Sequence, residues 1–274
     1  MVLLFIYNKT MGYKLVKLNT ARNSLRYVIK AFDIKEIYVP YYICPAIRNA
    51  VKKENCKIVF YHIDTKFKPT TTFPRDAYIL YSNYFGVCSK NVEELASMYP
   101  NLIVDNAHSF FAEPQGIASF NSLRKFFPTL RNGSFLYTKK IIDEKFEVDT
   151  YSYENKLLSR EELVKNENML DKEEIKYISE ITFNYFSDID LLSEKQLRKD
   201  KFNQFNEKYK VLNNLKIALN ENDFPFSYPY LTCNQKDADA FVNSLNQETY
   251  RYWTNLPDSY EEKIFYTNLV SISF

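Results

Sequence analysis

Short apolar runs alternate with stretches of helical periodicity up to about Lys140, and this alternation restricts the possible folds more than any other feature. The runs typical of strands lie at residues 36–40, 57–61, 77–81 and 102–104. Apolar residues at helical spacing predict helices at residues 21–30, 45–53 and 92–98. Strands that alternate with helices pair in parallel through right-handed crossovers. The sequence therefore predicts an α/β fold in which helices flank a mostly parallel sheet.

The pattern changes in the second half of the chain. Residues 161–219 are charged and helical in period. Two apolar stripes are expected there, one formed by Ile175, Ile178, Ile181 and Tyr185 and the other by Leu197, Phe202, Phe205 and Tyr209. A strand at 226–231 and a helix at 236–245 predict a small α+β end domain. The aromatic residues at 228–230 and 250–253 are expected in its core, with contact to the substrate as the alternative. We therefore expect a large domain at residues 1–145, a helical connector at 146–220 and an end domain at 221–274.

Charge and cysteine content exclude several classes of function. The 36 basic and 34 acidic residues give a net charge of +2, which favours neither nucleic acid nor a membrane surface as partner. The four cysteines form no C-x-x-C pair and there are two histidines, so no metal site is expected. Unpaired thiols are typical of a cytoplasmic protein.

No segment is expected to cross or target a membrane. The apolar opening of residues 1–7 is short and lacks a basic segment before it, so it is interpreted as a buried strand or docking segment. Later apolar runs fall short of the roughly 20 residues that a membrane span requires. We expect a soluble protein.

Asp105 and Lys125 are the strongest candidates for chemistry. Asp105 follows the apolar run at 102–104, and Lys125 comes one crossover later. An acid in this place can keep a pyridine nitrogen protonated, and a lysine can form an imine with an aldehyde, which are the two requirements of a pyridoxal 5'-phosphate (PLP) site. The alternative is structural: an acid that caps a helix, and a lysine beside Arg124 on a solvated face.

Five motifs together resemble the DegT/StrS family of sugar aminotransferases, which are PLP-dependent enzymes of fold type I. The motifs are Thr20-Ala21-Arg22-Asn23-Ser24-Leu25, Val39-Pro40-Tyr41-Tyr42-Ile43-Cys44, Tyr84-Phe85-Gly86, Asp105-Asn106-Ala107-His108 and Ser122-Leu123-Arg124-Lys125. They cover the first half of the chain, and the second half is similar in layout. The resemblance implies the large domain of that fold and PLP as the cofactor.

The resemblance also implies roles for individual residues. Asp105 would pair with the pyridine nitrogen, His108 would donate to the ring hydroxyl oxygen where the family more often has Gln, and Lys125 would carry the cofactor. The phosphate would lie at the helix start formed by Thr20, Ala21 and Arg22, where free N–H groups and the helix dipole favour a dianion. A serine, Ser119 or Ser122, would also reach the phosphate. Tyr42 or the sulfur of Cys44 would contact the cofactor ring.

By the same resemblance, the expected reaction moves an amino group from glutamate to a nucleotide-linked keto sugar for surface-polysaccharide synthesis, in a homodimer. Lys125 favours amino transfer, because relatives with histidine there perform dehydration. The chain is expected to be a short member, since the related enzymes run on past the end-domain strand. Two alternatives stay open: another PLP reaction such as elimination, and a non-catalytic relative that acts as a binding or dimerisation partner.

Overall fold

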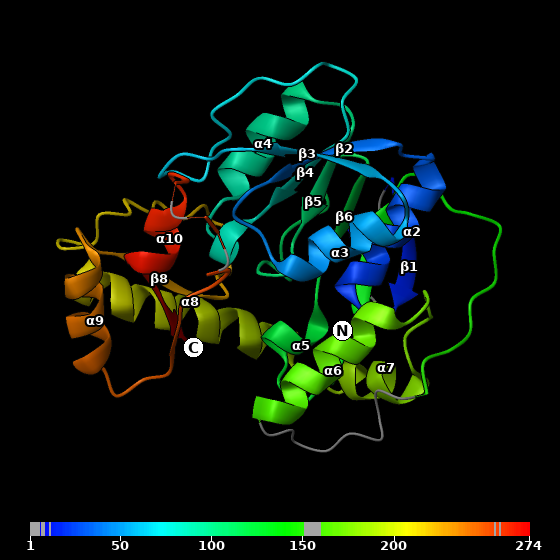
Figure 1. Ribbon diagram of the computed structural model, residues 1–274. Helices are drawn as coiled ribbons and strands as arrows, with labels where there is room; N and C mark the ends of the chain where they lie inside the picture. Colours follow the sequence, from blue (N-terminus) through cyan, green and yellow to red (C-terminus); the bar gives the residue numbers. More distant parts are fainter. Residues whose placement is uncertain (1–5, 7–8, 11, 151–159, 255, 258) are drawn as a thin grey trace.

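The computed structural model describes residues 6, 9–10, 12–150, 160–254, 256–257 and 259–274. A seven-stranded sheet forms the centre of its N-terminal part (Figure 1). The strands are β1 (Lys14–Leu18), β2 (Glu36–Pro40), β3 (Lys57–Tyr61), β4 (Ile79–Ser82), β5 (Leu102–Asp105), β6 (Ala118–Phe120) and β7 (Ser134–Thr138). The helices between them are α2 (Ala21–Phe32), α3 (Pro45–Lys53), α4 (Ser89–Met98) and α5 (Leu123–Phe126), with the 3-10 turn η1 (Tyr84–Gly86).

The strand order is β1-β7-β6-β5-β4-β2-β3. The neighbours from β3 to β6 pair in parallel, whereas β7 is antiparallel to both β6 and β1. The predicted α/β class with a mostly parallel sheet is confirmed. Strands β1, β6 and β7 were not predicted; β6 has three residues, and lysines interrupt the apolar pattern of β1.

Alternate side chains of the central strands fill the cores on the two faces of the sheet. Leu80 and Ile103 pack with Val28 of α2 on one face, and Tyr81 packs with Leu95 of α4 on the other. Figure 1 shows α3 and α4 on opposite sides of the sheet. Because both faces are covered, the parallel strands carry continuous apolar runs, and this is why the sequence reveals them.

Three helices follow the large sheet: α6 (Arg160–Lys172), α7 (Glu180–Ser187) and α8 (Leu191–Tyr209). Of the two apolar stripes predicted for this region, the second lies on α8, where Phe202 and Phe205 are buried and Leu197 is 45% exposed. The first stripe is wrong. Ile175 and Ile178 are buried in an extended stretch between α6 and α7, whereas Ile181 and Tyr185 on α7 are 40% and 62% exposed. Tyr177 of that stretch bridges to Leu18 at the end of β1, so the backbone there follows sheet rather than helix geometry.

The C-terminal part contains a three-stranded antiparallel sheet of order β8-β10-β9. Its strands are β8 (Ser227–Leu231), β9 (Thr249–Tyr250) and β10 (Leu269–Ser273), accompanied by α9 (Gln235–Asn243) and α10 (Lys263–Thr267). The predicted strand and helix at its start are confirmed, while the domain limits at 145 and 220 stay a prediction. Residues 1–7 lie outside the described part apart from Ile6, which is buried. Within the described ranges, no helix is long and apolar enough to span a membrane.

Candidate active site

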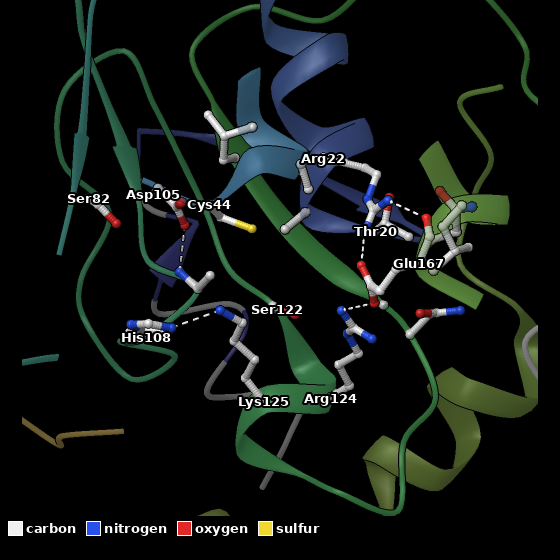
Figure 2. Close-up of a pocket in the computed structure, with 18 of the residues that line it drawn as sticks. Thr20, Arg22, Cys44, Ser82, Asp105, His108, Ser122, Arg124, Lys125 and Glu167 are labelled. Carbon is white, nitrogen blue, oxygen red and sulfur yellow. Dashed lines mark hydrogen bonds and ion pairs between the residues drawn. The ribbon is translucent and has the colours of Figure 1, made fainter. Parts of the chain in front are cut away.

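A pocket of about 650 Å³, part of it open to solvent, lies where β4 and β5 end and α2 begins (Figure 2). Ligands of open α/β sheets bind at this edge, because the carboxyl ends of parallel strands and the starts of the following helices meet there. Most of the predicted site residues line this pocket, namely Thr20, Ala21, Arg22, Asp105, His108, Ser122 and Lys125.

Asp105 is the last residue of β5 and lies opposite Ser82 of β4 in the parallel register. Its Oδ1 accepts a hydrogen bond from the backbone N–H of Ala107 at 2.8 Å, which fixes the carboxyl group, and the residue is only 5% exposed. Burial raises the pKa of Asp105, against the lowering effects of that hydrogen bond and of the charge of Lys125. A cationic partner in the pocket would therefore stabilise its ionised form.

Lys125 and His108 are in direct contact. The Nζ of Lys125 and Nε2 of His108 share a hydrogen bond of 2.8 Å, and burial lowers the pKa of Lys125. Burial also holds the pKa of His108 well below its usual value, with the charge of Lys125 acting in the same direction. His108 is therefore neutral, and its Nδ1 is buried with no hydrogen-bond partner among the described residues. A lowered pKa favours the neutral amine of Lys125, which is the form that imine chemistry requires.

Two aromatic rings from the C-terminal part stack on the imidazole of His108. The ring of Phe226 lies 4.7 Å away at 12° and that of Trp253 lies 5.7 Å away at 8°, so both are stacked on it. Trp253 also lines the pocket; the sequence predicts it in the end-domain core, with contact to the substrate as the alternative. The position of His108 thus depends on packing between the two sheets of the chain.

The start of α2 forms the other end of the pocket. Thr20 is the N-cap, and its Oγ1 accepts from the backbone N–H of Asn23 at 3.2 Å while keeping its own proton for donation. The first N–H groups of a helix, here those of Ala21 and Arg22, have no partner within the helix. Together with the hydroxyl group of Ser122, these donors suit an anion.

Two predicted contacts are corrected by their placement. Ser119 does not line the pocket; its Oγ is bonded to the N–H and the carbonyl oxygen of Gln115, both at 2.9 Å. Tyr42 is fully buried among aromatic rings, with Trp253 at 4.6 Å, and Cys44 lines the pocket instead. The chain turns after β2, so that residue 42 faces the aromatic core and residue 44 faces the pocket.

Glu167 of α6 is a pocket residue that the sequence did not indicate. Its carboxylate forms ion pairs with both Arg22 and Arg124, as Figure 2 shows, and Arg22 pairs further with Asp171. Burial opposes ionisation of Glu167, but the guanidinium groups of Arg124 and Arg22 outweigh it and lower the pKa. The sequence does not distinguish Glu167, because it is one of many charged residues in a helix whose composition predicts exposure to solvent.

Comparison with known proteins finds similarity in structure only. No protein-family model matches the sequence, and a sequence search of curated proteins gives no match either. A DegT DnrJ EryC1 StrS aminotransferase from Brucella abortus superposes with a TM-score of 0.62 at 12% identity, covering 100% of this chain and 84% of that one. A GDP-4-keto-6-deoxy-D-mannose-3-dehydratase from E. coli with bound hydrated PLP gives a TM-score of 0.66 at 14% identity, covering 99% and 87%.

A further structure of a GDP-4-keto-6-deoxymannose-3-dehydratase, with bound GDP-perosamine, gives a TM-score of 0.65 at 13% identity and covers 99% of this chain and 87% of that one. These similarities extend over both sheets, so they concern the arrangement of the whole chain. At such low identity they establish the fold and not the reaction. The chain has the fold of the fold type I PLP-dependent sugar aminotransferases and dehydratases, as its sequence motifs predicted.

Proposed function

We propose that this protein is a PLP-dependent enzyme that transfers an amino group from glutamate to a keto group of a nucleotide-linked sugar. One observation carries the proposal: Lys125, His108 and Asp105 meet in one buried pocket whose other end is the start of α2. Asp105 and His108 come from the end of β5 and the loop after it, whereas Lys125 comes from α5, and unrelated roles in packing would not require the two segments to converge. Burial shifts the pKa of all three, which is typical of catalytic sites.

The donor set of the pocket fits PLP. The carboxylate of Asp105 suits a protonated pyridine nitrogen, since a cation there would offset the cost of burying the acid. Nδ1 of His108 has no hydrogen-bond partner among the described residues, and a ring hydroxyl group is a partner of the expected kind. Thr20, Ser122 and the first N–H groups of α2 would hold the phosphate. Cys44 lines the same pocket and is the candidate for contact with the ring.

The roles of the residues follow from these contacts. When bound, PLP supplies an electron sink that stabilises charge on the neighbouring substrate carbon. Asp105 would keep the proton at the pyridine nitrogen. Lys125 would bind the cofactor through Nζ and, once released by the incoming amine, would move a proton at the substrate carbon, because its lowered pKa favours the neutral base. His108, on which Phe226 and Trp253 stack, would orient both Lys125 and the ring.

The choice of amino transfer rests on Lys125, which is retained at a place where the dehydrating relatives have histidine. Nucleotide-linked keto sugars are proposed as substrates because two structures of the same fold are dehydratases of a GDP-linked keto sugar. Glutamate as donor, surface-polysaccharide synthesis, a homodimeric assembly and a cytoplasmic location complete the proposal. They rest on the resemblance to the DegT/StrS family.

The test supplies the PLP-loaded protein with glutamate and GDP-4-keto-6-deoxy-D-mannose and analyses the products by mass spectrometry. We expect 2-oxoglutarate from the first half of the reaction and a sugar nucleotide that has gained nitrogen. Lys125→Ala should abolish both products, whereas His108→Gln, the residue more usual in the family, should retain activity. A sugar product that has lost water without gaining nitrogen would favour elimination. No product and no bound cofactor would favour the non-catalytic alternative.

A further inference from the structure

Both arginines that line the pocket are engaged by a single carboxylate. Glu167 pairs through Oε2 with Arg22 and through Oε1 with Arg124, and its backbone oxygen accepts from Nη1 of Arg22 at 3.1 Å. Figure 2 shows this carboxylate between the two guanidinium groups, at the end of the pocket that contains Thr20. Two guanidinium groups around one oxyanion are also the arrangement by which proteins bind phosphate.

The charges at this end of the pocket are already balanced. Arg22 and Arg124 contribute two positive charges, and Glu167 and Asp171 contribute two negative ones. The lowered pKa of Glu167 keeps its carboxylate ionised at neutral pH. A phosphate dianion near Thr20 would therefore find Arg22 and Arg124 already paired and would be repelled by the carboxylate of Glu167. Its binding would become more favourable if that carboxylate moved away.

The anchoring of α6 explains why the carboxylate is held there. The chain just after α6 is fixed to α3, since Nζ of Lys53 donates to the backbone oxygens of Lys172 and Glu173 at 2.8 and 2.6 Å. Leu170, one turn before, is 2% exposed and lines the pocket. Glu167 lies one turn before Leu170 in the helix. It is half-buried and reaches the edge of the pocket. The buried turn fixes the helix, and the more exposed glutamate is the part that a ligand can displace.

We infer that Glu167 is a built-in competitor for phosphate: its carboxylate occupies Arg22 and Arg124, and a phosphate group binds this end of the pocket by displacing it. For PLP as the ligand, the inference rests on the proposed function. Glu167 would then lower the affinity for the cofactor by competing with its phosphate group, without affecting the binding of its aldehyde group. Pyridoxal, which lacks the phosphate, should bind without regard to this residue.

The test compares wild type with Glu167→Gln, which keeps the shape of the side chain and removes its charge. Glu174→Gln is the matched control, because Glu174 pairs with Arg26 and Lys53 outside the pocket. Dissociation constants for PLP and for pyridoxal are measured by equilibrium dialysis. We expect Glu167→Gln to bind PLP about ten- to a hundredfold more tightly. Its affinity for pyridoxal, and both affinities of the control, should stay at the wild-type values.

Inorganic phosphate gives a second measurement that does not depend on PLP chemistry. We expect phosphate to raise the melting temperature of Glu167→Gln more than that of wild type or of the control, and Glu167→Ala repeats the test should the first variant fold poorly. If PLP does not bind to any form but phosphate still favours the Glu167 variants, the proposed function is overturned and the competition stands. If neither PLP nor phosphate binds more tightly to these variants, the inference is refuted.

Discussion

Replacing Gly86 by alanine should disturb the fold and the site together. Gly86 has φ +74, and a Cβ built on it would lie 2.4 Å from the carbonyl oxygen of His108, 3.1 Å from Cα of Pro225 and 3.2 Å from the N atom of Phe226. These are backbone atoms on both sides, so no flexible side chain can move away. The segment is also tied down by a hydrogen bond from the N–H of Phe226 to the carbonyl oxygen of Phe85 at 2.8 Å.

Two terms set the magnitude. A non-glycine residue in the left-handed region costs about 1–2 kcal/mol. Forcing an extra carbon into a packed site adds about 1–3 kcal/mol, so we expect Gly86→Ala to lower the free energy of unfolding by about 2–5 kcal/mol. Gly12 supplies the control, because it has φ +77 and its Cβ would meet no atom of the described residues within 4 Å. Gly12→Ala should therefore show the first term alone.

The assay is urea unfolding followed by tryptophan fluorescence. Trp253 is the one tryptophan of the chain and stacks on His108, so its emission in the native state also reports on the site. We expect Gly86→Ala to lose more stability than Gly12→Ala and to change the native emission, whereas Gly12→Ala leaves the emission unchanged. Equal losses for the two variants would show that the close approach of Gly86 to His108 does not exist in the folded protein.

Three other predictions concern the thiols, a buried amine and a buried acid. Cys44 lines the pocket, whereas Cys88 is buried and its pKa is raised by burial. A thiol reagent should therefore modify Cys44 in the native protein and Cys88 only after unfolding. Bound PLP should protect Cys44 from the reagent. Burial lowers the pKa of Lys9 to about 7, so between pH 7 and 10 the unfolded chain binds more protons than the folded one. The free energy of unfolding, measured by chemical denaturation, should therefore rise with pH in that window. Lys9→Met should remove this pH dependence. Glu262 is fully buried and accepts from the N–H of Ile63 at 3.0 Å, so Glu262→Ala should cost about 1–3 kcal/mol in urea unfolding, and an unchanged midpoint would contradict the role of that hydrogen bond.

The local signals of the sequence were sufficient to predict strands β2 to β5 of the central sheet and the core of the site. Apolar runs that end in a polar residue located β5 and Asp105, and the capping threonine located the start of α2. Lys125 was found from its order relative to Asp105. These features depend on a few neighbouring residues, which is why they can be inferred without the fold.

Contacts between distant segments could not be inferred in this way. Glu167 belongs to a helix whose charges look solvated, and only the folded chain shows that it pairs with Arg22 and Arg124. The stacking of Trp253 on His108 likewise depends on how the end of the chain packs against the large sheet. The choice of Cys44 over Tyr42 depends on how the backbone turns after β2, a local conformation that periodicity does not determine.

The attachment site of the cofactor tests the central claim most directly. The protein is incubated with one equivalent of PLP, reduced with borohydride, digested and analysed by peptide mass spectrometry. We predict that the pyridoxyl group is found on the peptide containing Lys125, and that Lys125→Ala abolishes this label while the protein stays folded. Label spread over surface lysines, or an unmodified Lys125 in the folded wild-type protein, would contradict the account.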